Sequence, residues 1–299
     1  MVEIRDQMDC TYQMNKSVEY IGTCIHPAMF TKSMKLLNLI FLLTVTSVAA
    51  LGQTVDGKQI THAELLTDAD DFSRPFTVGI RFVLEPDWYL YWKNPGDSGL
   101  PIDVKWDLPK GWMASELRHP VPSKFVYDNL VSYGYKKELV LLATLSPGSE
   151  PLEVLNARLD WLVCKESCVR GKADVSLPLK RNVRVDHAQS ILAYAQKKIP
   201  GSLSDLSLSV NESRIRKAEN SWEAEILLAG SGASSVTDFY PEISDEITIE
   251  FSSISVDNGI LRFRFDRQEP GTDKANIRGL FIAGGKGFEG TIPVQFTSM

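Results

Sequence analysis

The chain has 299 residues, of which 43% are hydrophobic and 23% charged, and its formal net charge is −6. These values are typical of globular proteins and leave room for two domains, so they exclude wholesale disorder and a multi-span membrane protein. The net acidity argues against a nucleic-acid partner, because binding to phosphates requires a basic face.

The N-terminal segment has the pattern of an export signal. Lys32 and Lys35 precede an apolar run that starts at Leu36, and the run is shorter than the stretch of about 20 residues that spans a membrane. Small residues follow at 49–52. We therefore expect cleavage near Gly52.

This interpretation divides the N-terminal region in two. Residues 34–52 form the expected signal peptide, and residues 1–33 are interpreted as a leader that is non-native or untranslated. The mature chain should begin near Gln53, retain two of the four cysteines, and be periplasmic without stable insertion into a membrane.

After Gln53, apolar and polar residues alternate between turn residues, which is typical of half-buried antiparallel strands. The strands expected in the first half are Phe76–Leu84, Trp88–Trp92, Ile102–Trp106, Leu139–Leu145, Ala157–Val163 and Ala173–Leu179. Short strands at this spacing predict an all-β fold built as a β-sandwich.

A helix is expected from Asp186 to Ile199, where apolar residues recur at helical spacing; Asp186 can cap its start and Pro200 stops it. Strands resume at Leu206–Val210, Ser221–Leu228, Glu246–Phe251, Ile260–Phe265, Ile277–Ala283 and Thr291–Phe296. The predicted organisation is a sandwich domain over residues 53–183, a helical linker over 184–202, and a second, smaller β-sandwich domain over 203–299.

The chemistry of the mature chain is concentrated in Cys164 and Cys168. In one extended strand these residues would lie about 13 Å apart, too far for a disulfide, so the chain must turn between them. A turn through residues 165–167 would place them opposite each other across a hairpin, about 4.5 to 5.5 Å apart at Cα, which permits a bond. Nearby Lys165, Arg170 and Lys172 would favour a thiolate, and Glu166 would oppose it.

A structural disulfide is the simpler interpretation of a lone cysteine pair in an exported protein. Closing so short a loop, however, lowers the entropy of the unfolded chain only slightly. It therefore stabilises the folded protein by only about 2 kcal/mol. Both interpretations therefore stay open on the residues alone.

Several motifs resemble those of one known family. They are Trp88–Pro101, Leu108–Trp112, His119–Pro122, Tyr133–Tyr135, Trp161–Cys168, Gly171–Ala173 and Leu177–Leu179. In order and spacing they are similar to the DsbD N-terminal domain family, the periplasmic portion of thiol:disulfide interchange proteins, over about residues 53–180. The C-terminal half resembles the second domain of the longer, copper-tolerance-associated ScsB-like branch.

The resemblance implies an immunoglobulin-like sandwich that acts as a thiol:disulfide oxidoreductase of the protein-disulfide reductase type. Its Cys164–Cys168 pair would take electrons from a membrane-embedded reductase of the DsbD or CcdA kind and pass them to periplasmic thioredoxin-like proteins. No cofactor is implied.

The resemblance also implies a loop that shields the cysteines until a partner docks. Residues 123–128 occupy the matching position, so Phe125 and Tyr127 are candidate cap residues. Tyr89 and Tyr91, two residues apart on one strand face, are candidates to line the site. For all four aromatic residues, ordinary core packing is the competing interpretation.

Two features depart from the family pattern. The cysteines have C-x3-C spacing, whereas the best-known branch has a longer insertion, so the hairpin tip and the redox potential are expected to differ. Full-length relatives continue into a transmembrane conduit and a thioredoxin-like domain, and neither is found in this sequence. We therefore expect either that electrons come from a separate protein or that the role has changed.

Other signals point to functions that we do not favour. Residues 96–99 match the surroundings of a chymotrypsin-type serine, but His62 lies too near the start of the domain to act as its base. Residues 284–287 lack the phosphate-loop pattern and are interpreted as a hairpin turn. The cysteines could bind copper or zinc only with further ligands, for which His119 and His187 are the candidates, so no metal site is predicted. The alternative functions are a non-enzymatic binding module with a structural disulfide, or a copper-binding or metal-tolerance protein.

Overall fold

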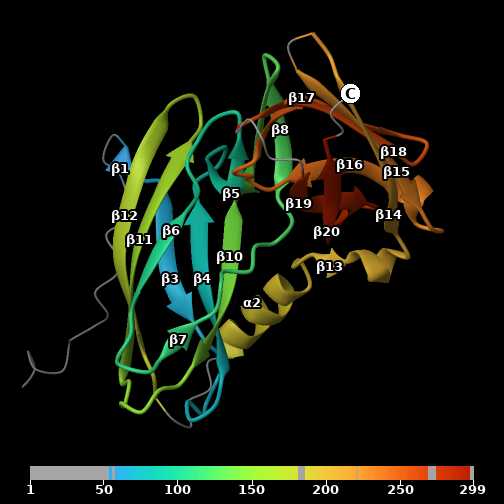
Figure 1. Cartoon of the computed structure of the whole chain (residues 1–299). Coiled ribbons are helices and arrows are strands. Elements are labelled where there is room, and N and C mark those ends of the chain that lie inside the picture. The colour runs from blue at the N-terminus through green and yellow to red at the C-terminus, as the bar shows by residue number, and fades with distance from the viewer. Residues whose placement is uncertain (1–53, 56–57, 181–185, 220, 269–273, 297–299) are drawn as a thin grey trace, which may run out of the picture. The chain divides into compact units, whose positions relative to one another are not determined.

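The computed structural model describes residues 54–55, 58–180, 186–219, 221–268 and 274–296 (Figure 1). The predicted leader and signal peptide lie outside these residues. The described chain consists mainly of antiparallel strands, so the prediction of an all-β fold is confirmed. Among the described residues, no helix has both the length and the apolar character needed to cross a membrane.

The first half of the described chain forms two main sheets and a small pair. The pair is β1 (Thr54–Val55) with β2 (Lys58–Gln59), and one sheet has the order β3 (Thr61–Leu66), β4 (Phe76–Leu84), β10 (Glu138–Ser146), β7 (Met113–Ala114). The other has the order β12 (Cys168–Pro178), β11 (Val154–Cys164), β5 (Tyr89–Gly96), β9 (Leu130–Lys136), β8 (Ser123–Tyr127), and β6 (Asp103–Asp107) also pairs with β11.

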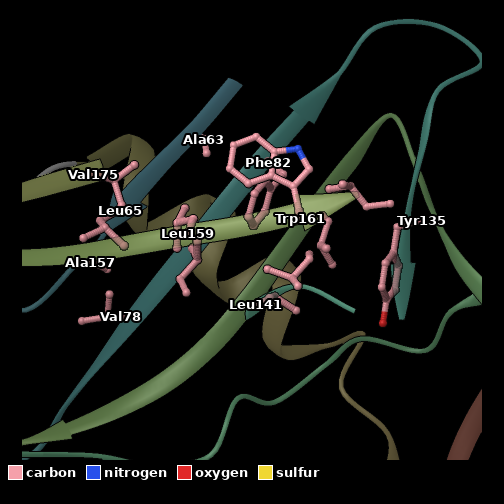
Figure 2. Close-up of a cluster of buried hydrophobic side chains, with 14 of the residues drawn as sticks. Ala63, Leu65, Val78, Phe82, Tyr135, Leu141, Ala157, Leu159, Trp161 and Val175 are labelled. Carbon is pink, nitrogen blue, oxygen red and sulfur yellow. The ribbon is translucent and has the colours of Figure 1, made fainter. Parts of the chain in front are cut away.

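Side chains from these two sheets form one hydrophobic core (Figure 2). Phe82 of β4 and Trp161 of β11 meet edge to face, with ring centroids 5.3 Å apart. Alternation along each strand directs every second residue into this layer, as expected for a sandwich. The core therefore holds β11 firmly up to the residue before Cys164, because Val163 is fully buried.

The helix α2 (Asp186–Gln196) forms where the periodicity predicted one. It ends three residues earlier than expected, although Ile199 still donates a backbone hydrogen bond to the carbonyl of Gln196. Leu192 and Ala195 pack in one cluster with Leu142 of β10. The predicted capping side chain of Asp186 is outside the described part of the structure.

The second half forms two four-stranded sheets. One has the order β13 (Gly201–Ser202), β20 (Lys286–Gln295), β19 (Lys274–Ala283), β16 (Val236–Pro241), and the other β14 (Ser209–Lys217), β15 (Trp222–Ala229), β18 (Ile260–Arg267), β17 (Ile247–Asp257). Short 3-10 turns, η2 (Leu203–Leu206) and η3 (Ala233–Ser235), precede β14 and β16. Phe239, Phe263 and Phe281 lie in the hydrophobic cluster of this half.

The structure corrects one prediction about the first half. Residues 123–128 were expected to form a loop, but residues 123–127 are strand β8, which pairs with β9 as a hairpin. Asp128 and Asn129 form the tip with φ of 46° and 68°, the left-handed conformation that two-residue hairpin turns require. Asp and Asn tolerate this conformation better than most residues, which is why the hairpin can form here.

Candidate functional site

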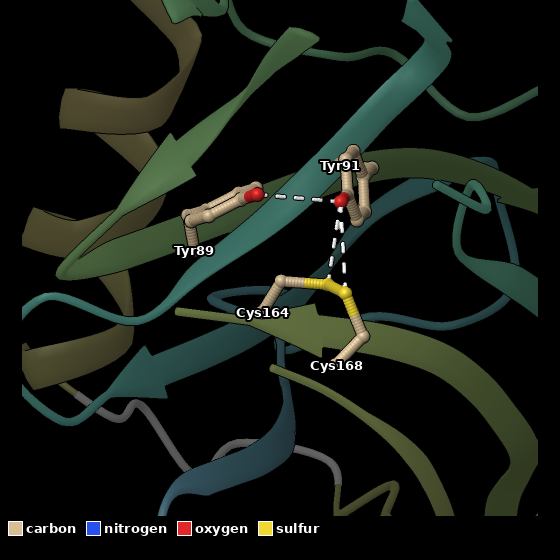
Figure 3. The surroundings of a disulfide bond; sticks show 4 residues. All are labelled: Tyr89, Tyr91, Cys164 and Cys168. Atoms are coloured by element: carbon tan, nitrogen blue, oxygen red, sulfur yellow. Dashed lines mark hydrogen bonds between the residues drawn. A yellow bond between two sulfur atoms is a disulfide. The ribbon is translucent and has the colours of Figure 1, made fainter. Parts of the chain in front are cut away.

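The two cysteines close the hairpin between β11 and β12. They are register partners at its end, and a disulfide joins them with a Cα–Cα distance of 4.1 Å (Figure 3). The chain reverses through residues 165–167, where Lys165 donates a backbone hydrogen bond to the carbonyl of Ser167. The predicted hairpin is confirmed, with the α-carbons slightly closer than the 4.5 to 5.5 Å expected of opposed residues.

The two halves of the disulfide differ in exposure. Cys164 is only 1% exposed, because it ends a strand with a neighbour on each side, whereas Cys168 is exposed at the start of β12. Residues 165–167 of the turn are exposed as well. An incoming thiolate can therefore reach the disulfide from the Cys168 side, which leaves Cys164 as the departing sulfur.

Two tyrosines of β5 lie beside the disulfide. Tyr89 is the register partner of Cys164, and its hydroxyl is 3.3 Å from that of Tyr91. The Tyr91 hydroxyl donates to Sγ of Cys164 at 3.2 Å and lies 4.0 Å from Sγ of Cys168 (Figure 3). This arrangement places a hydrogen-bond donor on the sulfur that would leave as a thiolate.

The Tyr91 phenol stays protonated at neutral pH. Burial, together with the hydrogen bond to Tyr89, raises the pKa of Tyr91 well above its ordinary value of 10. The residue is only 2% exposed. Its hydroxyl can therefore act as a lasting donor to sulfur and not as a base.

Of the two candidate cap residues, only Phe125 lies near the tyrosines. Its ring centroid is 5.2 Å from that of Tyr89, and Nζ of Lys136 lies 4.9 Å from the Phe125 centroid. Tyr127, two residues further along β8, is 78% exposed. The structure thus places Tyr89 and Tyr91 beside the disulfide and packs Phe125 on Tyr89, and it leaves Tyr127 in solvent near the hairpin tip.

The cations near the cysteines have carboxylate partners. Lys165 lies 3.3 Å from Asp87, and Arg170 binds Asp160 through two contacts of 2.9 Å. Lys172 lies 3.5 Å from the same Asp160. The expectation that these cations favour a thiolate is therefore weakened, because a paired cation presents little net field to a sulfur.

The histidines considered as metal ligands lie apart from any acidic or sulfur cluster. In the part of the chain that the structure covers, no group of three or more His, Cys, Asp or Glu side chains is placed to hold a metal. Burial, with the neighbouring positive charge of Lys93, lowers the pKa of His119 to about 4. His187 is exposed on α2.

Sequence reasoning missed two glycines that shape the site. A Cβ at Gly99, where φ is +113°, would lie 2.3 Å from the Tyr91 ring, and one at Gly171 would lie 2.0 Å from Trp161. Each glycine thus lets an aromatic ring approach the backbone closely. Both glycines lie within motifs that carry the family resemblance, but nothing in the sequence indicates which ring covers each of them.

The structure thus defines a β-sandwich with a disulfide that closes the β11–β12 hairpin beside two tyrosines. Residues 62–180 match the sequence model of the family described as thiol:disulfide interchange protein DsbD, N-terminal. This part of the chain, from β3 through β12, is therefore similar to the N-terminal domain of DsbD.

Solved structures extend the likeness beyond that segment. The N-terminal periplasmic domain of ScsB from Proteus mirabilis superposes with a TM-score of 0.64 at 15% identity, covering 84% of this chain and 100% of that one. At this identity the match establishes a shared fold. A chaperone–tip adhesin complex (CsuC–CsuE) of Csu pili from Acinetobacter baumannii covers 74% of this chain and 90% of that one at 13% identity, but its TM-score of 0.16 supports no inference. No curated protein sequence is significantly similar to the chain.

Proposed function

We propose that this protein is a periplasmic thiol–disulfide interchange module. Its Cys164–Cys168 pair would relay electrons from a membrane-embedded reductase of the DsbD or CcdA type to exported thioredoxin-like proteins. The family of residues 62–180 supports the reaction class. The observation that carries the proposal is the asymmetric disulfide, with Cys168 exposed and Cys164 buried against the Tyr91 hydroxyl.

Each half-reaction moves two electrons and two protons. In the reduced module, the Cys168 thiolate attacks the partner's disulfide, forms a mixed disulfide and expels one partner thiolate. Cys164 then loses its proton and attacks Sγ of Cys168, which expels the second partner thiolate and restores the Cys164–Cys168 bond. The two partner thiolates take up two protons, so the partner is reduced and the module is oxidised.

The electron donor reduces the Cys164–Cys168 disulfide by the same steps in the opposite direction, and the donor's dithiol is oxidised to a disulfide. A donor thiolate attacks Sγ of Cys168, and Cys164 leaves as a thiolate beside the Tyr91 hydroxyl. A hydrogen bond to a charged sulfur is stronger than one to a neutral sulfur, so Tyr91 stabilises the departing group. Cys168 is thus assigned as the attacking and attacked cysteine, and Cys164 as the resolving one.

Trapping the mixed disulfide tests this assignment. Full-length protein with Cys10→Ser and Cys24→Ser would carry either Cys164→Ala or Cys168→Ala. The probe would be a thioredoxin that lacks its resolving cysteine and whose remaining cysteine is activated as a mixed disulfide with thionitrobenzoate, so that attack expels thionitrobenzoate and no second thioredoxin thiol can reverse the adduct. We expect Cys164→Ala to form an adduct that dithiothreitol cleaves, and Cys168→Ala to form at least about tenfold less, because its remaining thiol is buried. The variant lacking both cysteines is the control. An adduct from neither single variant would refute the proposal.

A second function has one observation in its favour. The burial of Cys164 is also what a structural disulfide in a binding module would show. The reduction potential separates the two functions, because inert structural disulfides have potentials below about −300 mV and exchanging ones lie higher.

A further inference from the structure

The second half of the chain contacts the β8–β9 hairpin through a half-buried ion pair. Nζ of Lys124 on β8 lies 3.3 and 3.0 Å from the two carboxylate oxygens of Asp238 on β16. The two side chains are 21% and 23% exposed. At this burial an ion pair fixes its side chains more firmly than surface pairs do.

Aromatic packing reinforces this contact. Tyr133 of β9 is the register partner of Lys124, so the two side chains lie on the same face of the hairpin. The Tyr133 ring centroid is 4.7 Å from that of Tyr240 on β16 and 6.0 Å from that of Phe251 on β17. The hairpin face that bears Lys124 is therefore covered by the second half of the chain.

The opposite face of the hairpin bears Phe125. Consecutive residues on a strand point to opposite sides, so anchoring Lys124 also sets the position of the Phe125 ring. That ring packs on Tyr89, whose hydroxyl contacts that of Tyr91. A continuous set of contacts thus joins Asp238 to the sulfur that Tyr91 touches.

We propose that Asp238 and Tyr240 are positioning residues for the disulfide. They hold the β8–β9 hairpin so that Phe125 stays packed on Tyr89, and this packing limits the access of thiols to the Cys164–Cys168 bond. The second half of the chain thereby sets the reactivity of a site to which it contributes no sulfur or hydroxyl group. The inference deepens the proposed function, because it concerns the reactivity of the same cysteine pair.

The test is the rate at which dithiothreitol reduces the Cys164–Cys168 disulfide in the full chain with Cys10→Ser and Cys24→Ser. We expect Asp238→Ala and Tyr240→Leu each to raise the second-order rate about three- to tenfold, the range that couplings through packed side chains produce. The matched control is Glu225→Ala, which removes an ion pair with Arg262 within β15 and β18 of the same half. It should leave the rate unchanged.

A charge exchange separates positioning from general destabilisation. If the ion pair acts by holding the hairpin, the double variant Lys124→Ala with Asp238→Ala should be reduced no faster than Lys124→Ala alone. The exchanged pair, Lys124→Glu with Asp238→Lys, should return the reduction rate toward that of the wild type. Should Asp238→Ala fail to fold, Asp238→Asn removes the charge with little change of shape.

Rates of the Asp238 and Tyr240 variants that equal or fall below the wild-type rate would overturn the inference, and so would an equal increase in Glu225→Ala. Dithiothreitol reports on access to the disulfide whether or not protein partners exchange with it. Failure here therefore leaves the thioredoxin trapping result standing, and failure of the trapping leaves this result standing.

Discussion

Two long hairpins of this protein have strands of nearly the same length and very different ends. The β11–β12 hairpin has strands of 11 residues and the β19–β20 hairpin has strands of 10. The first ends in a disulfide under Tyr91, whereas the second ends at Gly284 and Gly285, where an added Cβ would meet no atom within 4 Å. The comparison shows that a hairpin end becomes a candidate site because another element packs on it, which here is strand β5 with its two tyrosines.

The largest expected difference between the two hairpins is in how much stability each loses when a glycine is replaced by alanine. Gly171→Ala would drive a Cβ into the buried Trp161 ring and should lower the free energy of unfolding by about 3 kcal/mol. Gly285→Ala should lower the free energy of unfolding by only about 1 kcal/mol, because alanine is disfavoured in the left-handed backbone conformation that Gly285 adopts at φ 74°. Urea denaturation of the two variants measures both losses. Equal losses would show that the Trp161 ring gives way and that β11–β12 is no more constrained than β19–β20.

These two hairpins also show what the sequence could predict. The turn at residues 284–287 and the hairpin between the cysteines both followed from local rules, because turn residues and strand spacing are properties of neighbouring positions. The contact of Tyr91 with Cys164 joins residues far apart in the chain. Its sequence signal was limited to the motif that contains Tyr89 and Tyr91 and to their shared strand face.

The β8–β9 hairpin was missed for a related reason. The family resemblance predicts a loop for the segment that holds Phe125 and Tyr127, whereas Asp128 and Asn129 are residues typical of a tight turn between two strands. The carboxylate partners of Lys165 and Arg170 were also missed, since Asp87 and Asp160 approach them only once the strands pair. Local sequence patterns thus predict where the strands lie. They do not predict which charged side chains form ion pairs, because those contacts exist only in the folded sheet.

Acid is expected to weaken the half of the chain that carries the disulfide. His119 has a pKa of about 4 in the folded protein, against an ordinary value of 6.5, and its Nδ1 is buried without a hydrogen-bond partner. The folded state therefore binds fewer protons than the unfolded state between these values, so stability is complete above pH 6.5 and falls as the pH drops toward 4. The loss should reach about 2 to 3 kcal/mol.

The second half of the chain, residues 203–299, contains no histidine, because the last histidine of the sequence is His187. Urea denaturation from pH 7 to pH 4 measures the effect, and His119→Gln should flatten the curve. An unchanged slope in that variant would assign the acid sensitivity to other residues.

The smallest expected effect concerns the hydroxyl over the disulfide. Tyr91→Phe removes the donor to Sγ of Cys164, so the departing thiolate is less stable and reduction by dithiothreitol should slow by about tenfold. Tyr89→Phe should slow it less, because its hydroxyl contacts Tyr91 and not sulfur. The control is Tyr194→Phe, because Tyr194 of α2 is exposed. A faster reduction of Tyr91→Phe would show that the tyrosine acts mainly as a shield.

The reduction potential of the Cys164–Cys168 pair tests the central claim most directly. Equilibration of the protein lacking Cys10 and Cys24 with redox buffers, followed by alkylation of free thiols, gives this value. An exchanging disulfide predicts a potential above about −300 mV, within reach of thioredoxin-like partners. A potential below that value would mark the bond as structural and would contradict a role in electron transfer.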